Sequence, residues 1–195
     1  MKTEYRKYIK WSTLPRIILY TGFRMEANGK TLSAVRQLVE EKDKVWKRGI
    51  VSNIHLNNID YEYNSFNAVY KLFEVTNKRI LLDNPFNVMY SRRYESRNIA
   101  SFLYWIHVCR KFNNKVILVM PDIKTIDKRV RKIIGAIFIP KFWINKYGTP
   151  KLELIRIYRN KIVVYPTINA RKYFKYYNTL EIQPIEKMEK NGVSE

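Results

Sequence analysis

The chain has 195 residues, the length of one domain with room for a continuous hydrophobic core. Hydrophobic residues make up 46% and charged residues 28%, a balance that excludes a disordered protein. The formal net charge is +20, and such an excess of Lys and Arg attracts nucleic acids or anionic membrane surfaces. A composition bias that only keeps the protein soluble is the plainer explanation of this charge.

Cysteine and histidine are too scarce for several kinds of site. Cys109 is the single cysteine, which excludes an intramolecular disulfide and a cysteine-based metal cluster. His55 and His107 are too few for a zinc site without carboxylate ligands, and we expect both to be structural. The first residues lack a signal-peptide pattern, and no apolar run is long enough to span a membrane. We therefore expect a soluble protein whose only metal is magnesium bound with a nucleotide.

Apolar runs and helical periodicity alternate along most of the chain. In chain order they predict a strand at 16–21, a helix at 31–41, a strand at 47–54, a helix at 65–75, a strand at 78–82, a helix at 96–111, a strand at 115–120 stopped by Pro121, a helix at 125–133 and a strand at 136–139. The strands lack polar alternation, as expected when both faces of a parallel sheet are covered. The pattern predicts an α/β fold with helices on both faces of a mainly parallel sheet.

The C-terminal part differs in character. Residues 152–158 and 162–165 are separated by three polar residues and predict a β-hairpin added to the sheet or packed beside it. The Tyr- and Lys-rich residues 172–177 could stack on exposed bases, although packing against the sheet is the commoner fate of such a segment. We expect one domain over residues 1–183, with a core at about 14–140, a β extension at about 150–183 and a flexible tail at 184–195.

The most specific motif lies between the first expected strand and the first expected helix. Gly29-Lys30-Thr31 there resembles the end of a phosphate-binding loop, in which backbone N–H groups and a lysine surround an anion and the Thr hydroxyl binds magnesium. Gly22 begins the loop, and six residues separate it from Gly29 where four are usual. The spacing leaves open whether the loop folds over the phosphate or blocks it.

A second component of such a site is an acid at the end of a neighbouring strand. Asp83 follows the expected strand at 78–82 and is the candidate, although it could simply cap the turn before Pro85. Asn84 stands where hydrolytic relatives of this architecture commonly have a Glu that polarises water. An amide orients water but does not accept its proton at neutral pH, so we expect slow hydrolysis. Glu26 within the loop is a speculative substitute.

Further motifs occur in a definite order along the chain. They are residues 52–56, residues 59–61, Leu81-Leu82-Asp83, Ser91-Arg92-Arg93 leading to Arg97-Asn98 and Arg110-Lys111, residues 116–120, residues 126–131 and residues 177–181. Together with the phosphate loop, they make residues 17–185 resemble the FtsK–HerA-like P-loop ATPases of archaeal viruses and plasmids. This family is related to viral DNA-packaging ATPases and to the zonular occludens toxin-like proteins of filamentous phages.

The resemblance implies a three-layer α/β/α P-loop NTPase with strand order 5-1-4-3-2, ATP and Mg²⁺ as ligands, ring assembly, and movement of DNA. It also implies a cytoplasmic location, that of a host cell if the protein is viral, and capsid or virion proteins as possible partners. The implied nucleotide contacts are Gly22, Asn28, Gly29, Lys30, Thr31 and Leu32, and the implied metal ligands are Thr31 and Asp83. Arg97 or Arg110 could reach a neighbouring subunit's γ-phosphate.

Three departures from the family pattern argue for weak or lost hydrolysis. They are the longer loop, Asn84 in place of Glu, and Pro121 in place of a phosphate-sensing Gln. Lys128, Arg129 and Arg131 are either contacts to the DNA backbone or ordinary surface charge. Three functions remain open from the sequence: a DNA-packaging or DNA-translocating ATPase, a non-hydrolysing relative acting in virion assembly, and a basic nucleic-acid-binding protein.

Overall fold

One sheet of ten strands forms the centre of the protein. The computed structural model describes residues 2–22, 29–41, 48–64, 69–85, 97–158 and 161–178. The strands are β1 (Lys2–Tyr5), β2 (Ile17–Gly22), β3 (Gly49–Ser52), β4 (Glu62–Tyr63), β5 (Lys78–Asp83), β6 (Lys115–Asp122), β7 (Ala136–Ile144), β8 (Pro150–Tyr158), β9 (Lys161–Val164) and β10 (Ile168–Asn169). Their order is β1-β9-β8-β7-β2-β6-β5-β3-β4, and β10 pairs with β8.

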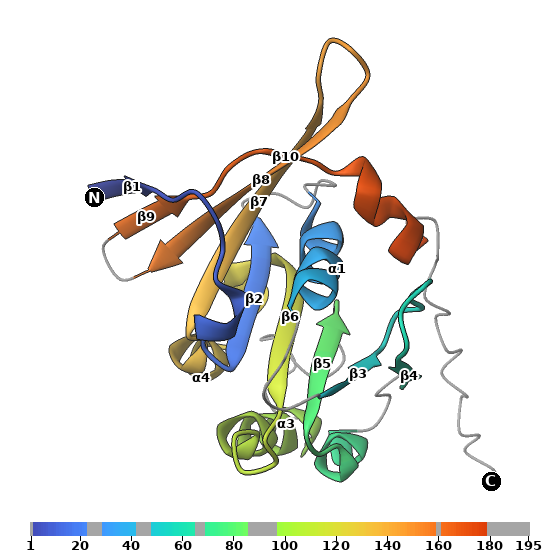
Figure 1. The fold of residues 1–195 in the computed structure, drawn as a ribbon. Coiled ribbons are helices and arrows are strands. Elements are labelled where there is room, and N and C mark those ends of the chain that lie inside the picture. The colour runs from blue at the N-terminus through green and yellow to red at the C-terminus, as the bar shows by residue number, and fades with distance from the viewer. Residues whose placement is uncertain are drawn as a thin grey trace, which may run out of the picture.

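The middle of the sheet has the expected topology. Strands β7-β2-β6-β5-β3 are mutually parallel and follow the predicted order 5-1-4-3-2. Additional strands extend both edges. On one edge β8 pairs antiparallel with β7, β9 pairs antiparallel with β8, and β1 pairs in parallel with β9; on the other edge β4 pairs in parallel with β3. The result is an α/β fold with a mainly parallel core and an antiparallel extension (Figure 1).

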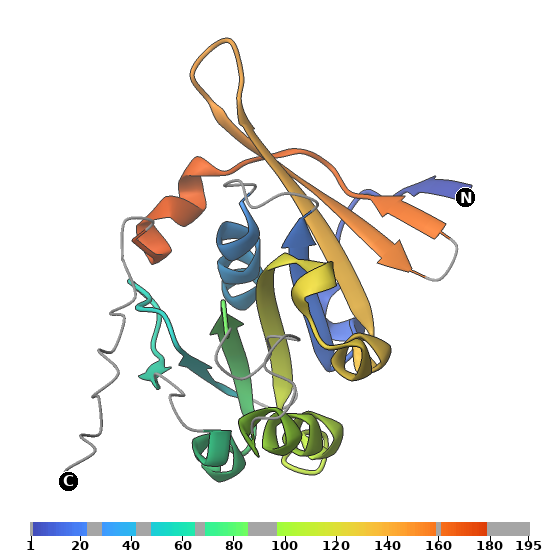
Figure 2. The same cartoon turned by 180° about the vertical axis from the view of Figure 1, so that it is seen from behind.

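Helices cover both faces of the sheet (Figures 1 and 2). The α-helices are α1 (Lys30–Glu40), α3 (Arg97–Val108) and α4 (Lys128–Ile133), and the 3-10 helices are η1 (Trp11–Thr13), η2 (Val69–Glu74), η3 (Ile123–Thr125) and η4 (Arg171–Tyr176). Alternate residues of β2 show the two faces, because Ile18 and Tyr20 pack with α1 and Leu19 packs with α3. The expected three layers are therefore present.

Several predicted elements differ in length or kind. Strand β6 does not stop at Pro121 but continues to Asp122. The register of β2 against β6 shifts between Tyr20 and Gly22, and proline, which has no backbone N–H to donate, is tolerated at such an irregularity. The expected helix at 65–75 is the 3-10 helix η2 where it is described, and residues 65–68 lie outside the described part. The β8–β9 hairpin is confirmed, but the sequence did not predict β1 or the longer hairpin of β7 with β8.

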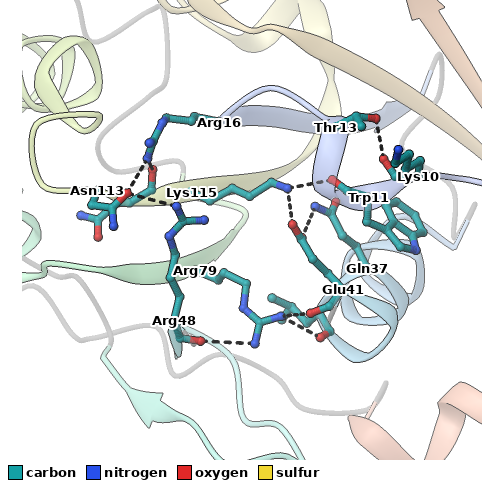
Figure 3. A network of polar contacts seen from close by, with 12 residues as sticks. Lys10, Trp11, Thr13, Arg16, Gln37, Glu41, Arg48, Arg79, Asn113 and Lys115 are labelled. Atoms are coloured by element: carbon teal, nitrogen blue, oxygen red, sulfur yellow. Dashed lines mark hydrogen bonds and ion pairs between the residues drawn. The ribbon is translucent and has the colours of Figure 1, made fainter. Parts of the chain in front are cut away.

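A buried polar network fixes the C-terminal end of α1 (Figure 3). The Lys115 ammonium donates to the Glu41 carboxylate and to the Trp11 carbonyl oxygen, the latter at 3.1 Å. Gln37 Nε2 donates to the other Glu41 oxygen at 3.0 Å. The Arg79 guanidinium donates to the carbonyl oxygens of Leu38 and Glu41, which belong to the last turn of the helix. With this end of the helix held in place, the N-terminal end of α1 has a fixed position near the carboxyl ends of the central strands.

Candidate nucleotide-binding site

The N-terminus of α1 lies at the carboxyl edge of the central strands. Gly29 occupies the N-cap position in the left-handed region, with φ 74° and ψ 26°. Its carbonyl oxygen accepts hydrogen bonds from the Ser33 backbone N–H at 2.9 Å and from the Ser33 hydroxyl at 2.7 Å. The N–H groups of the first helical turn have no partners within the helix and carry its positive dipole end. This arrangement suits an anion such as phosphate.

Gly29 could not be another residue without rearrangement. A Cβ atom at this position would lie 3.0 Å from Phe142 Cβ and 3.2 Å from Leu152 Cδ1, which belong to β7 and β8. The positive φ also disfavours any side chain. The long β7–β8 hairpin therefore packs directly against the last residue of the phosphate loop.

Thr31 and Asp83 come together although they are far apart in the sequence. The Thr31 hydroxyl donates a 2.6 Å hydrogen bond to Asp83 Oδ2. Asp83 is 5% exposed, and its Oδ1 atom is buried with no hydrogen-bond partner among the described residues. Burial raises the pKa of Asp83 to about 6, although the Thr31 hydrogen bond and the Lys30 charge act in the opposite direction. A carboxylate with one unsatisfied buried oxygen is a costly arrangement that a bound cation would relieve.

Asn53 holds the backbone of Asp83 in place. Its side-chain oxygen accepts from the Asp83 N–H at 2.7 Å, and its side-chain nitrogen donates to the Asp83 carbonyl oxygen at 2.8 Å. The amide thus continues the pairing of β3 with β5 by one residue and satisfies both backbone groups of the acid. Asn53 was part of a sequence motif but was not predicted as a site residue. The signal was its position directly after β3, beside the strand that ends in the acid.

Two further side chains share the electrostatic environment of Asp83. Lys30 is half-buried, and burial lowers its pKa while the Asp83 charge raises it. Burial and the Asp83 charge raise the pKa of the half-buried Tyr177 to about 12. Tyr177 reaches this position through an antiparallel bridge to Leu56 and a 2.7 Å hydrogen bond from the Asn57 N–H to the Tyr176 carbonyl oxygen. Tyr177 belongs to the motif at residues 177–181, but it was not predicted as a site residue.

The donor set is consistent with magnesium. Mg²⁺ prefers hydroxyl, carboxylate and phosphate oxygens, and it usually keeps several waters and few protein ligands. Thr31 Oγ1 and Asp83 Oδ1 supply such oxygens. Among the described residues no group of three or more His, Cys, Asp and Glu side chains could hold a metal by itself.

Solved structures show what this architecture is. The N-terminal domain of zonular occludens toxin from Neisseria meningitidis matches with a TM-score of 0.60 and 17% identity, over 85% of this chain and 100% of that one. The fold is that of a P-loop NTPase. The KaiC-like protein PH0186 of Pyrococcus horikoshii matches over 76% of this chain and 88% of its own, with 16% identity and a TM-score of 0.45. Neither a protein-family model nor a curated protein matches the chain.

Other predicted contacts of the P-loop have varied positions. Gly22 is buried at the end of β2, paired with Asp122 of β6. Leu32 is buried among Leu152, Ala170 and Tyr173, and so its side chain packs the helix against the β extension. Asn28 and Glu26 lie outside the described residues.

Asn84 is exposed and has φ 47°, a conformation that Asn tolerates better than most residues. Its backbone N–H donates to the Val119 carbonyl oxygen at 2.9 Å. Pro121 lies within β6, the strand next to Asp83. The left-handed turn accounts for Asn at position 84 on backbone grounds alone.

The candidate arginines and basic residues lie on α3, just after it, or on α4. Arg110 is exposed just after α3, and its carbonyl oxygen accepts from Asn113 at the edge opposite the phosphate loop. Arg97 begins α3, and its side chain is outside the described part. Within α4, Lys128 and Arg131 are exposed. Arg129 forms a bidentate pair with Asp127, which caps that helix.

The two histidines have surroundings that do not involve the site. His55 stacks on Tyr63 with ring centroids 4.2 Å apart, and its Nδ1 lies 3.0 Å from the Tyr61 hydroxyl. His107 is exposed in the last turn of α3. Among the described helices, none is long and apolar enough to cross a membrane.

Proposed function

We propose that the protein binds ATP with Mg²⁺ at the N-terminus of α1 and hydrolyses it weakly to move or package DNA. Gly29 and the first-turn N–H groups would surround the phosphates, and Lys30 would reach the outer ones. Thr31 and Asp83 would hold the magnesium, whose charge would neutralise that of the triphosphate.

The state of Asp83 carries this proposal. The carboxylate is buried, held on one oxygen by Thr31 and along its backbone by Asn53, and left with an unsatisfied second oxygen. A residue that only capped the turn before Pro85 would direct both oxygens to N–H groups or water. The fold supports the same assignment, because the end of β5 meets the first turn of α1, where Thr31 contacts Asp83.

Calorimetric titration with a non-hydrolysable ATP analogue and Mg²⁺ tests the binding site. Lys30→Ala and Asp83→Asn should each weaken binding, whereas the exposed Lys132→Ala serves as a matched control and should bind like the wild type. In the absence of Mg²⁺, the Asp83→Asn variant and the wild type should bind alike. If Lys30→Ala leaves the affinity unchanged, the site assignment is wrong.

The geometry at Asn84 favours weak turnover over fast turnover. An amide in a left-handed turn cannot take a proton from water at neutral pH, and a Glu in its place would have to adopt the same disfavoured φ. A phosphate-release assay with Mg²⁺ and DNA measures the basal rate. A rise in rate for Asn84→Glu would identify a degenerate hydrolase. Nucleotide binding with no release in either protein would favour the non-hydrolysing alternative in virion assembly.

DNA, a homo-oligomeric ring and virion proteins are the proposed partners, and the cytoplasm of a host cell is the proposed location. The net charge of +20 and the exposed Lys128 and Arg131 on α4 support DNA binding. In a ring, Arg110 or Arg97 would act on the site of a neighbouring subunit, which is consistent with the distance of Arg110 from its own site. Light scattering with and without nucleotide measures the assembly. DNA affinity that depends on salt but not on ATP would favour the plain nucleic-acid-binding alternative.

A further inference from the structure

The β7–β8 hairpin extends beyond the rest of the molecule and carries apolar side chains at its end. In both views its turn lies clear of the sheet and helices (Figures 1 and 2). We call residues 143–149 the hairpin tip. Trp143 is 40% exposed, Ile144 66% and Tyr147 77%. Large apolar side chains gathered on a projecting turn are unfavourable in water and indicate a contact surface.

Hydrogen bonds within the hairpin tip hold its backbone in a defined conformation. Asn145 Oδ1 accepts hydrogen bonds from the Tyr147 N–H at 3.1 Å and from the Thr149 N–H at 2.8 Å. The Asn145 N–H donates to the Thr149 carbonyl oxygen at 3.0 Å, and Gly148 takes the positive φ of 70° that closes the turn. Trp143 and Ile144 therefore lie at fixed register positions, opposite Lys151 and Pro150. Little conformational entropy would be lost when such a turn binds.

Positive charge surrounds these apolar side chains. Residues 141–151 contain three lysines and no acidic residue. The Lys146 ammonium lies 5.0 Å from the centre of the Tyr147 ring, and Lys151 pairs across the hairpin with Trp143. Lys141 is further from the turn, where it has a 3.7 Å contact to Glu153. These side chains therefore suit a deformable partner surface that has anionic groups on the outside and an apolar layer just beneath them.

We propose that the hairpin tip inserts into the interfacial region of an anionic lipid surface. Trp and Tyr are favoured at that depth, Ile144 would reach the acyl boundary, and lysines would contact headgroup phosphates. Stacking of nucleic acid bases explains Trp143 and Tyr147 but not the exposed aliphatic Ile144. A second copy would need an apolar recess for the tip. A pocket of about 450 Å³ in the described structure has a mixed lining of charged side chains such as Arg48 and Asp60 and apolar ones such as Ile50 and Ile59, so self-association is measured below as the competing outcome.

Sedimentation with lipid vesicles tests the proposal on the full chain. The vesicles are phosphatidylcholine alone or mixed with phosphatidylglycerol. Wild-type protein should bind the mixed vesicles, and Trp143→Ser/Ile144→Ser/Tyr147→Ser should lose about ten-fold or more in affinity. Lys146→Ala should lose about five-fold.

The matched control is Tyr70→Ser/Tyr104→Ser. Both side chains are mostly exposed, but they belong to η2 and α3, at the other end of the molecule from the hairpin tip (Figure 1). The control should bind vesicles like the wild type. Unfolding midpoints within the experimental error of the wild type show that each variant is folded.

A depth measurement separates insertion from surface charge. Brominated phosphatidylglycerol should quench part of the tryptophan fluorescence of the wild type, and Trp143→Phe should remove that part while vesicle affinity is kept. Unchanged quenching in Trp143→Phe overturns the proposal. It is also overturned if the wild type does not bind mixed vesicles, or if the triple variant and the control bind equally. Loss of single-stranded DNA binding or of self-association in the triple variant, with vesicle binding intact, assigns the tip to another partner.

Discussion

Replacing Asp83 by Asn should stabilise the nucleotide-free protein at neutral pH while it removes magnesium binding. The folded-state pKa of Asp83 is about 6, above its ordinary value of 3.8, because burial penalises the charged carboxylate. This difference corresponds to about 3 kcal/mol between the protonated and ionised forms. Asn is neutral at every pH and can still accept the Thr31 hydrogen bond, so it avoids that cost.

The sign of the pH dependence follows from the raised pKa. The stability that protonated Asp83 provides is fully present below pH 3.8 and is lost as the pH rises through about 6. The free energy of unfolding of Asp83→Asn should therefore exceed that of the wild type by up to about 3 kcal/mol at pH 7.5. Near pH 4 the two free energies should be nearly equal. Other titrating groups are common to both proteins and cancel in the difference.

Urea unfolding followed by circular dichroism at pH 4, 6 and 7.5 measures this difference. Asp60→Asn, an exposed carboxylate, is the matched control and should change the free energy of unfolding by less than about 0.5 kcal/mol at every pH. Adding magnesium to the nucleotide should further stabilise the wild type above pH 6 and add little stability to Asp83→Asn. A difference between Asp83→Asn and the wild type that does not depend on pH would refute the reasoning.

Three other substitutions test the contacts around α1 in unfolding measurements. Gly29→Ala should lower the free energy of unfolding by about 2 kcal/mol, because the new Cβ meets β7 and takes a positive φ; a neutral effect would show that the loop adjusts. Asn53→Ala should cost about 2 kcal/mol and weaken magnesium-dependent binding in calorimetry, whereas Asn57→Ala, an exposed amide nearby, should do neither. Lys115→Met should cost about 4 kcal/mol, since it leaves Glu41 buried and unpaired, and Lys115→Met/Glu41→Leu should recover most of that loss; a double variant as unstable as the single one would contradict this.

Local sequence patterns predicted the parallel core well because its strands are buried on both faces. Ile18, Leu19 and Tyr20 have no polar alternation, and all three are fully buried in the centre of the sheet. Asp83 was predicted because such a site has an acid at the end of a neighbouring strand, and Thr31 because it ends the phosphate-loop motif. Their meeting at 2.6 Å needed only the correct strand order, which the family resemblance supplied.

The remaining parts of the site depend on contacts that no local pattern encodes. The role of Asn53 requires that β3 be the neighbour of β5 and end two residues earlier in register. The left-handed conformation of Asn84 depends on a hydrogen bond to Val119 of another strand. The four non-glycine residues with positive φ in the described part are all Asn, so an Asn outside helices and strands is a usable signal for a left-handed turn.

The antiparallel extension packs against the proposed nucleotide site and is not an appendage to the core. Phe142 and Leu152 come from opposite strands of the β7–β8 hairpin, more than a hundred residues after Gly29, and both contact the position where its Cβ would lie. Leu152 also packs with Leu32 in the first turn of α1. Closely packed side chains do not allow one partner to move freely without the other. Any force on the projecting end of the hairpin therefore acts on the packing around Gly29 and the first turn of α1.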